Sequence, residues 1–207
     1  MSLYGRLFAA GYDTVMAGSE KAVLRGHRKA LLGRVAGRVI EIGGGTGVNL
    51  PFYGGAIEDL IITEPEEPMA RRLQRKLADH SLRARVVQAR AEELPFEDQS
   101  FDFAVSTLVL CTVDDPERAL EEIHRLLKPN GQLLFVEHVR ATNPRLARWQ
   151  DRLHGFQVRF AHGCHCNRRT LESIEDAGFR VTELTHDRLR MAPPIVHPLI
   201  VGAANRP

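Results

Sequence analysis

A cluster of glycines is the strongest chemical signal in this sequence of 207 residues. Residues 39–42 form a short, mainly apolar run that predicts a buried parallel strand, and Gly43, Gly44, Gly45 and Gly47 follow it. Glycine tolerates positive φ and lets a ligand approach the backbone closely. Such a turn presents backbone N–H groups to a bound molecule, although an ordinary tight turn between a strand and a helix has the same composition.

A carboxylate lies where the next strand is expected to end. Glu64 closes the apolar run of residues 60–64 and follows Glu41 at about the separation, roughly 20 residues, that brings an acid to a ribose. A carboxylate in this place accepts hydrogen bonds from the two vicinal hydroxyls of the sugar. The arrangement therefore predicts a nucleoside ligand, which is either NAD or S-adenosylmethionine (SAM).

The spacing of the glycines favours SAM over a dinucleotide. The dinucleotide pattern G-x-G-x-x-G would place its third glycine at Val48, whereas the sequence has Gly47. None of the three tyrosines is followed four residues later by a lysine, so the Tyr-x-x-x-Lys pair of hydride-transferring enzymes is absent. The pattern Glu41-x-Gly43-x-Gly45-x-Gly47 resembles motif I of the class I SAM-dependent methyltransferases. That resemblance implies that these residues, with Gly44 and Glu64, bind SAM.

A second motif follows the strand predicted at residues 85–88. The stretch from Ala91 to Asp102 resembles the A-E-x-L-P-F…S-F-D motif of the ubiquinone/menaquinone-type methyltransferases. The resemblance implies that Ala91 and Glu92 lie against the adenine. Arg90 stands where that family usually has Asp, and a cation cannot accept a hydrogen bond from the adenine amino group. We therefore expect the base contact to come from the backbone, from Glu92 or from elsewhere.

Four further segments resemble the methyltransferase-like 7 subgroup, whose members methylate thiols on small molecules. They are residues 110–113, 137–139, 163–170 and 197–202, and the whole resemblance covers about residues 36–205. It implies a small-molecule acceptor, with a thiol as the first candidate. Quinone and phospholipid N-methyltransferases share the core motifs, so those acceptors stay open, as does a non-catalytic SAM-binding protein. The apolar membrane anchor of the animal members has no counterpart at this N-terminus.

Histidines and cysteines provide the candidates for catalysis and for metal binding. His138 ends the fifth predicted strand and could assist deprotonation of an acceptor, or it could be a packed residue; His186 is a weaker second candidate. The run from His162 to Cys166 contains four metal-ligand side chains, but structural zinc needs pairs of ligands separated by a longer loop. We therefore expect no metal, and Cys111 could join such a site only through folding.

The order of apolar runs predicts the elements that position these residues. We expect an α/β fold, a three-layer Rossmann-like sandwich whose seven-stranded, mostly parallel sheet has an antiparallel last strand and helices on both faces. Strand four, at residues 101–110, should open Thr107 and Leu108 onto the ligand. A first crossover helix is predicted at residues 48–53. Residues 1–35 predict two helices broken around Gly18, a possible lid from which Tyr12 faces inward.

Composition sets the remaining limits. Apolar and charged fractions of 43% and 26% are typical of a globular chain, and one domain over residues 1–207 is expected. A net charge of +2 gives no reason to expect a nucleic-acid partner. Three cysteines suggest a reducing compartment, and no apolar run approaches the roughly 20 residues of a membrane span. These features predict a cytoplasmic protein; they do not indicate its oligomeric state.

Overall fold

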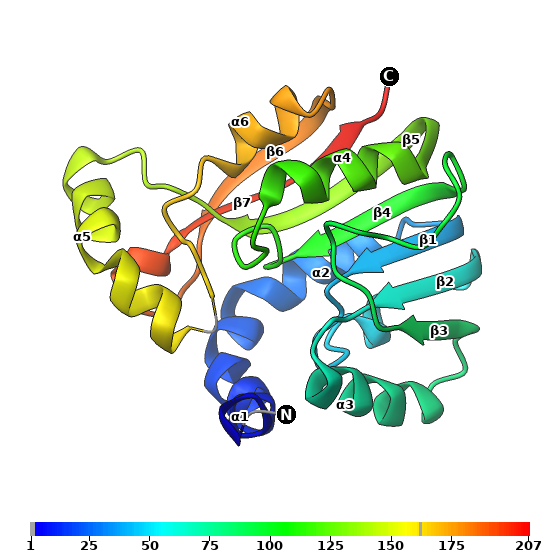
Figure 1. Ribbon diagram of the computed structural model, residues 1–207, viewed down its shortest axis with the longest axis horizontal. Coiled ribbons are helices and arrows are strands. Elements are labelled where there is room, and N and C mark those ends of the chain that lie inside the picture. Colours follow the sequence, from blue (N-terminus) through cyan, green and yellow to red (C-terminus); the bar gives the residue numbers. More distant parts are fainter. Residues whose placement is uncertain (1–2, 162) are drawn as a thin grey trace.

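A seven-stranded sheet forms the centre of the molecule (Figure 1). The computed structural model describes residues 3–161 and 163–207, with side chains from residue 11 onward. The strands, in the spatial order β3-β2-β1-β4-β5-β7-β6, are β1 Gly37–Ile42, β2 Ile57–Thr63, β3 Ala84–Val87, β4 Phe101–Thr107, β5 Leu127–His138, β6 Arg180–Arg188 and β7 Pro198–Asn205. Strand β7 runs antiparallel to both of its neighbours, β5 and β6, and the pairings among β1 to β5 are parallel. The predicted mostly parallel sheet with an antiparallel last strand is confirmed.

The central strands are apolar because both of their faces are covered. Along β1, Val39 points into one hydrophobic cluster, whereas Ile40 and Ile42 point into the other. Helices α2 (Arg25–Leu32) and α3 (Glu67–Ala78) contribute to the first cluster; α4 (Pro116–Leu126) and α6 (Thr170–Asp176) contribute to the second. Helix α5 (Pro144–Phe160) lies beyond the ends of the strands (Figure 1). The result is the three-layer arrangement predicted from the sequence.

The glycine turn is not followed by the α-helix predicted at residues 48–53. That segment forms turns and one 3₁₀ helix, Leu50–Phe52. Pro51 lacks an N–H, and the pair Gly54 and Gly55 ends the segment before a full α-helical turn can propagate. The backbone N–H groups of the turn are therefore presented without the dipole of a long helix behind them.

The N-terminal extension also differs from its prediction. Helix α1 (Leu3–Ser19), a π-helical turn (Glu20–Leu24) and α2 run on without the expected break at Gly18. A Cβ on Gly18 would lie 3.2 Å from Cβ of Met191, so this glycine allows a close approach and does not end the helix.

Strand β4 ends three residues earlier than predicted. Leu108 adopts a φ of +60°, which turns the chain away from the sheet immediately after Thr107. This turn sends residues 109–111 across the end of β5, where they form part of the site described below. Within the described residues, no helix has the length and the apolar character needed to cross a membrane.

Candidate active site

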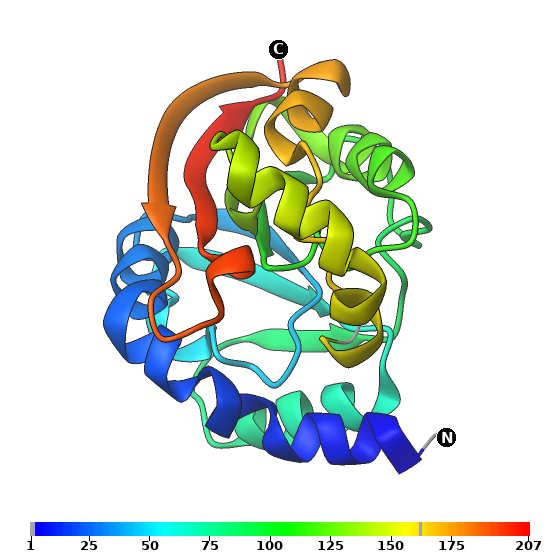
Figure 2. The ribbon, with the colours of Figure 1, turned by 90° about the vertical axis from the view of Figure 1, so that its left-hand side faces the viewer.

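The functional residues gather where the parallel strands end. In Figure 1 the arrowheads of β1, β2, β4 and β5 point toward the side of the molecule that α1 and α5 occupy. Figure 2, which faces that side, shows α1 running alongside α3, with α5 on the opposite side of the strand ends. Carboxyl ends of strands are the usual ligand-binding edge of an open α/β sheet. The sequence motifs therefore converge at the edge where chemistry is expected.

Three of the four glycines in the turn are required by backbone conformation. Gly43, Gly45 and Gly47 have φ values of +61°, +55° and +80°. Gly44 is required by packing, since a Cβ there would lie 2.2 Å from Cγ2 of Ile62. At Gly45, by contrast, an added Cβ would meet no atom within 4 Å. The turn thus packs closely against the sheet on one side and leaves space for a ligand at Gly45.

Glu64 lies directly beside the glycine turn, as its position in the sequence predicted. Its carboxylate accepts hydrogen bonds from the backbone N–H groups of Gly45 (2.8 Å) and Glu66 (2.9 Å). Burial raises the pKa of this carboxyl, and the two N–H donors act in the opposite direction. A carboxylate held between the turn and the start of α3 suits the hydroxyls of a ribose.

Replacing Glu64 by alanine tests this assignment. Loss of hydrogen bonds to a charged group should weaken SAM binding by about 1–3 kcal/mol, which is a factor of about 5–150 in Kd measured by calorimetry. Glu66→Ala is the matched control, because it removes an exposed carboxylate two residues away and should leave the affinity unchanged. Equal affinities in the two variants would contradict the ribose assignment.

Glu41 lies in a buried hydrogen-bond network beside the glycine turn. Its two carboxylate oxygens accept from Nδ2 of Asn49 (2.8 Å) and the hydroxyl of Tyr53 (2.7 Å), and burial raises its pKa. Arg28 donates to Oδ1 of Asn49 (2.5 Å) and to Oγ1 of Thr107 (3.1 Å). This buried network ties α2, the turn and the end of β4 together. Sequence reasoning missed Arg28 and Asn49, which carry no motif of their own.

Helix α1 lies across the glycine turn. Asp13 accepts from Oγ1 of Thr46 in the turn (2.5 Å) and from Nζ of Lys76 on α3 (2.8 Å). Tyr12 is half-buried, and burial raises its pKa to about 12; the charge of Arg28 acts against this, while Cys111 and Cys164 add to it. The extension therefore covers the turn from outside, the position that a lid would take.

The predicted adenine-binding loop is tied to its neighbours by acids. Glu92 accepts from the backbone N–H groups of Asp114 (2.9 Å) and Asp115 (3.3 Å), while Ala91 is buried. Arg90 is exposed and pairs with Glu92 and Asp114. Arg90 thus bridges the loop after β3 and the loop before α4, at the place where the related methyltransferases usually have Asp.

An aspartate at position 90 should not weaken the cofactor site. The ion pairs of Arg90 are exposed and are expected to contribute at most about 1 kcal/mol to stability. We expect Arg90→Asp to bind SAM as tightly as the parent or more tightly in calorimetry, because a carboxylate can accept from the adenine amino group. Arg169→Asp, which also removes an exposed cation paired with an acid, controls for charge. A large loss of affinity would mean that Arg90 itself holds the ligand.

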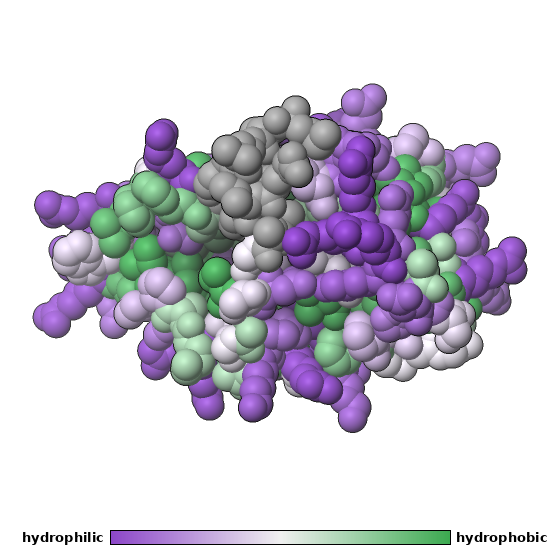
Figure 3. Space-filling view, turned by 90° about the horizontal axis from the view of Figure 1, so that it is seen from below, coloured by the Kyte–Doolittle hydropathy of each residue, from purple (hydrophilic) through white to green (hydrophobic). Residues whose placement is uncertain are grey.

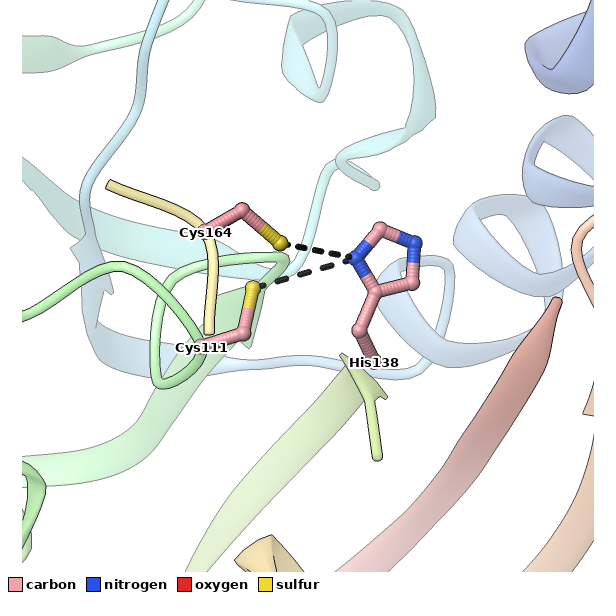
Figure 4. Close-up of side chains that lie close together, drawn as sticks. All are labelled: Cys111, His138 and Cys164. Atoms are coloured by element: carbon pink, nitrogen blue, oxygen red, sulfur yellow. Dashed lines mark hydrogen bonds between the residues drawn. The ribbon is translucent and has the colours of Figure 1, made fainter. Parts of the chain in front are cut away.

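Cys111, His138 and Cys164 meet next to these loops (Figure 4). They come from the loop after β4, the end of β5 and the loop after α5, and all three are buried. Nδ1 of His138 lies 3.6 Å from Sγ of Cys164 and 3.9 Å from Sγ of Cys111. Nε2 of His138 is buried and has no hydrogen-bond partner in the described part of the chain. The sequence pointed to each residue separately and did not show that they meet.

The run of residues 162–166 does not act as one site. Cys164 turns toward His138, whereas the ring of His165 lies 4.9 Å from that of His154, and Cys166 packs in the core. His162 lies outside the described residues. The other catalytic candidate, His186, lies on β6 at the exposed edge of the sheet, and it is not part of the cluster.

Hydrogen bonds from both backbone and side chains hold the two cysteine loops together. Glu137, fully buried, accepts from Oγ of Ser106 (2.7 Å) and from the N–H of Val109 (3.0 Å). The N–H of His165 donates to the carbonyl of Cys111 (2.6 Å), and Arg168 donates to the carbonyl of Leu110 (2.7 Å). The cluster is therefore built on a fixed frame of three segments.

The pKa values of the two thiols are shifted in opposite directions. A hydrogen bond from Cys111, opposed by burial and assisted by His138, lowers the pKa of Cys164. The same hydrogen bond, together with burial, raises the pKa of Cys111. Cys164 is consequently the thiol that carries negative charge first, beside the ring of His138.

Two large apolar side chains of α5 and one from the loop after β6 are exposed to solvent. Trp149 and Phe156 are 55% and 62% exposed, and Met191, in the loop after β6, is 78% exposed. Figure 3 shows hydrophobic residues gathered on the α5 side of the molecule, whereas the opposite side of that face is mainly hydrophilic. None of these three side chains belongs to the hydrophobic core.

Comparison with known proteins identifies the family. The family described as "Methyltransferase domain" matches residues 40–135. The thiol S-methyltransferase TMT1B of Homo sapiens is 33% identical over 90% of this chain and 78% of its own length; that of Rattus norvegicus is 35% identical over 70% and 61%. This chain belongs to the class I SAM-dependent methyltransferases. Membership confirms the family that motif I and the following motifs predicted.

Two more comparisons define what this methyltransferase shares with its relatives. The ubiquinone/menaquinone biosynthesis C-methyltransferase UbiE of Hahella chejuensis is 33% identical over 57% of the chain and 49% of its own length, so the shared part is the core. A Thermotoga maritima structure, described as a SAM-dependent methyltransferase and possible histamine N-methyltransferase, aligns with a TM-score of 0.72 at 25% identity. That alignment covers 98% of both chains, so the whole fold is that of a methyltransferase.

Proposed function

We propose that this methyltransferase transfers the methyl group of SAM to the sulfur of a small-molecule thiol. One observation carries the acceptor assignment: three segments that resemble the thiol-methylating subgroup converge in space at Cys111, His138 and Cys164. The convergence lies at the edge of the sheet that also holds the glycine turn. The relative named as a thiol S-methyltransferase, matched over 90% of the chain, supports the same assignment.

The residues at the glycine turn fit SAM as the cofactor. Gly45 leaves open space beside the turn, and the carboxylate of Glu64 stands next to it to receive the ribose hydroxyls. When bound, SAM supplies a methyl group on a positively charged sulfur, and no further electrophile is needed. We assign Glu41 and Thr107 to the buried network that supports the turn. We assign Ala91, Glu92 and Leu108 to the walls of the site. Tyr12 closes it from α1.

The protein's own contribution is orientation and exclusion of water. Holding an acceptor sulfur in line with the methyl group can supply up to about 7–11 kcal/mol of the barrier. A thiol needs little base, because a thiol of pKa about 8.5 is already a few per cent ionised at neutral pH. We assign His138 the role of binding and deprotonating the acceptor thiol. Its Nε2 is buried and has no partner among the described residues, so it can hydrogen-bond the acceptor sulfur and take up its proton.

A pH series with His138→Ala tests this role. The loss in turnover at pH 7 should not exceed about 30-fold, because about 3% of a thiol of pKa 8.5 is already thiolate there. The loss should shrink as the pH rises toward the acceptor's own pKa, where no base is needed, and SAM affinity should stay the same. His186→Ala, on the exposed β6, should match the parent throughout. A loss independent of pH would show that His138 serves structure only.

A screen with methyl-labelled SAM decides the acceptor class. The panel contains alkyl and aryl thiols, amines, quinols and phenols, each at several concentrations. Methylation of thiols alone supports the proposal. Methylation of quinols or amines without thiols would favour the quinone or phospholipid type of acceptor, and SAM binding without turnover on any class would indicate a non-catalytic binding protein.

A further inference from the structure

We propose that Cys111, His138 and Cys164 form a binding site for Zn²⁺. The donors are two thiol sulfurs and one imidazole nitrogen, which is a ligand set that zinc uses when three protein ligands leave the fourth position open. Each donor comes from a different segment, and all three side chains are buried. This assignment replaces the expectation of no metal, which rested on the close spacing of the ligands in residues 162–166 and left Cys111 to folding.

The distances between the donors match tetrahedral zinc. Bonds of about 2.3 Å to sulfur and about 2.0–2.1 Å to nitrogen, at tetrahedral angles, separate a sulfur from a nitrogen by about 3.6 Å and two sulfurs by about 3.8 Å. Here the sulfur–nitrogen distances are 3.6 Å to Cys164 and 3.9 Å to Cys111, and all three donor atoms lie within 4.8 Å of one another. The two sulfur–nitrogen distances therefore need to change by only a few tenths of an ångström for a cation to bind.

The orientation of the imidazole also suits a metal ligand. Nδ1 of His138 faces both sulfurs, and the other ring nitrogen points away from them (Figure 4). Coordination through Nδ1 places the ring proton on Nε2, which has no partner in the described part of the chain and so stays available to a ligand. Two thiolates and a neutral imidazole around a dication form a neutral site, which a buried position tolerates.

Hydrogen bonds around the site hold the three ligands together before any metal binds, which lowers the entropy cost of binding. The hydrogen bond from the N–H of His165 to the carbonyl of Cys111 joins the two cysteine loops. Glu137 holds the chain between β4 and Cys111 through Ser106 and Val109. Since the donors are already together, binding orders little additional chain, and affinity is limited mainly by displacement of the thiol protons.

The open position gives the site a use in the reaction. No other described His, Cys, Asp or Glu joins the cluster, so a fourth ligand can come from outside the protein. This use rests on the proposed thiol acceptor: the thiol binds at the cation as thiolate, and its proton leaves to solvent. The thiolate sulfur then takes the methyl group as the bond from that methyl to the SAM sulfur breaks. In the zinc-loaded protein His138 therefore donates from Nε2, and its role as a base is confined to the zinc-free protein.

Metal content of reduced protein tests the site directly. The full chain is stripped with chelator, loaded with excess Zn²⁺, desalted and analysed by elemental mass spectrometry. We expect one Zn²⁺ per chain in the parent, and its loss in Cys111→Ser and Cys164→Ser. Cys166→Ser is the matched control, because Cys166 is also buried in the same loop but lies outside the cluster, and it should retain the metal.

Cobalt gives a second readout that needs no variant to fold. Co²⁺ bound to the parent should show the visible bands of a tetrahedral site and thiolate charge-transfer absorption in the near ultraviolet. Absence of these bands, substoichiometric Zn²⁺ in the reduced parent, or equal retention of metal in both serine variants would each overturn the assignment. Neither measurement uses SAM or an acceptor, so a failed metal site and a failed thiol specificity give different results.

Discussion

Replacing Gly45 by valine should abolish SAM binding. Gly45 adopts a φ of +55°, and an added Cβ would point into space where no protein atom lies within 4 Å. The two methyl groups of valine would occupy the approach to the turn and would strain a left-handed backbone by about 1–3 kcal/mol. The same strain would move the N–H that donates to Glu64. Calorimetry should detect binding in the parent and none in the variant.

Two further glycine variants separate obstruction from strain. Gly45→Ala carries the same backbone penalty with a smaller side chain, so it should retain weakened binding. Gly55→Val, in a loop where an added Cβ also meets nothing and φ is not positive, should bind SAM as the parent does. Unchanged affinity in Gly45→Val, with circular dichroism confirming its fold, would remove the glycine turn from the cofactor site.

Replacing Glu137 by alanine should give the largest loss of stability. Its side chain accepts from Ser106, Val109 and Cys111, and no part of it is exposed. Leaving buried donors without partners costs about 1–3 kcal/mol each, so we expect a loss of about 2–4 kcal/mol after the cost of burying the carboxylate is removed. Denaturant unfolding measures the change as a lower midpoint with an unchanged slope.

The consequence of this loss should reach the thiol cluster. Without Glu137 the segment from Val109 to Cys111 is no longer fixed. The variant should therefore show weaker Co²⁺ absorption bands and lower turnover than the parent. Glu183→Ala is the matched control: it removes a glutamate whose ion pair with Arg34 is exposed, and its stability should stay within about 0.5 kcal/mol of the parent. Equal midpoints in the two variants would show that Glu137 is not the anchor of the loop.

The sequence determined the fold and the cofactor edge because these depend on local patterns. Apolar runs separated by helical segments specify a parallel sheet, and the run of residues 198–205 returns antiparallel beside β5. The roles of Gly43, Gly45 and Gly47 can be predicted from sequence because only glycine adopts positive φ without strain. The position of Glu64 beside the glycine turn can be predicted because neighbouring parallel strands end at the same edge of the sheet. Each of these inferences needs only a few neighbouring residues.

Two predictions of secondary structure from local pattern were wrong, one after the glycine turn and one in the N-terminal helices. Residues 48–53 look helical, yet Pro51 and the glycines after it leave only a 3₁₀ turn. Gly18 looks like a helix breaker, yet it is a contact point for Met191 within a continuous helix. At Gly18 the deciding contact, Met191, lies far along the chain from the window in which periodicity is read. At residues 48–53 the deciding residue, Pro51, lies within that window.

The thiol cluster was decided by tertiary structure alone. The sequence concentrates histidines and cysteines at residues 162–166, but only Cys164 of the described members of that run faces the site. Its partners are Cys111, which Leu108 turns back across the sheet with its φ of +60°, and His138, which the parallel register brings to the same edge. A contact between residues 27 and 26 positions apart leaves no periodic trace in the sequence. Its cause is the meeting of three strand and helix ends, which only the packed sheet can bring together.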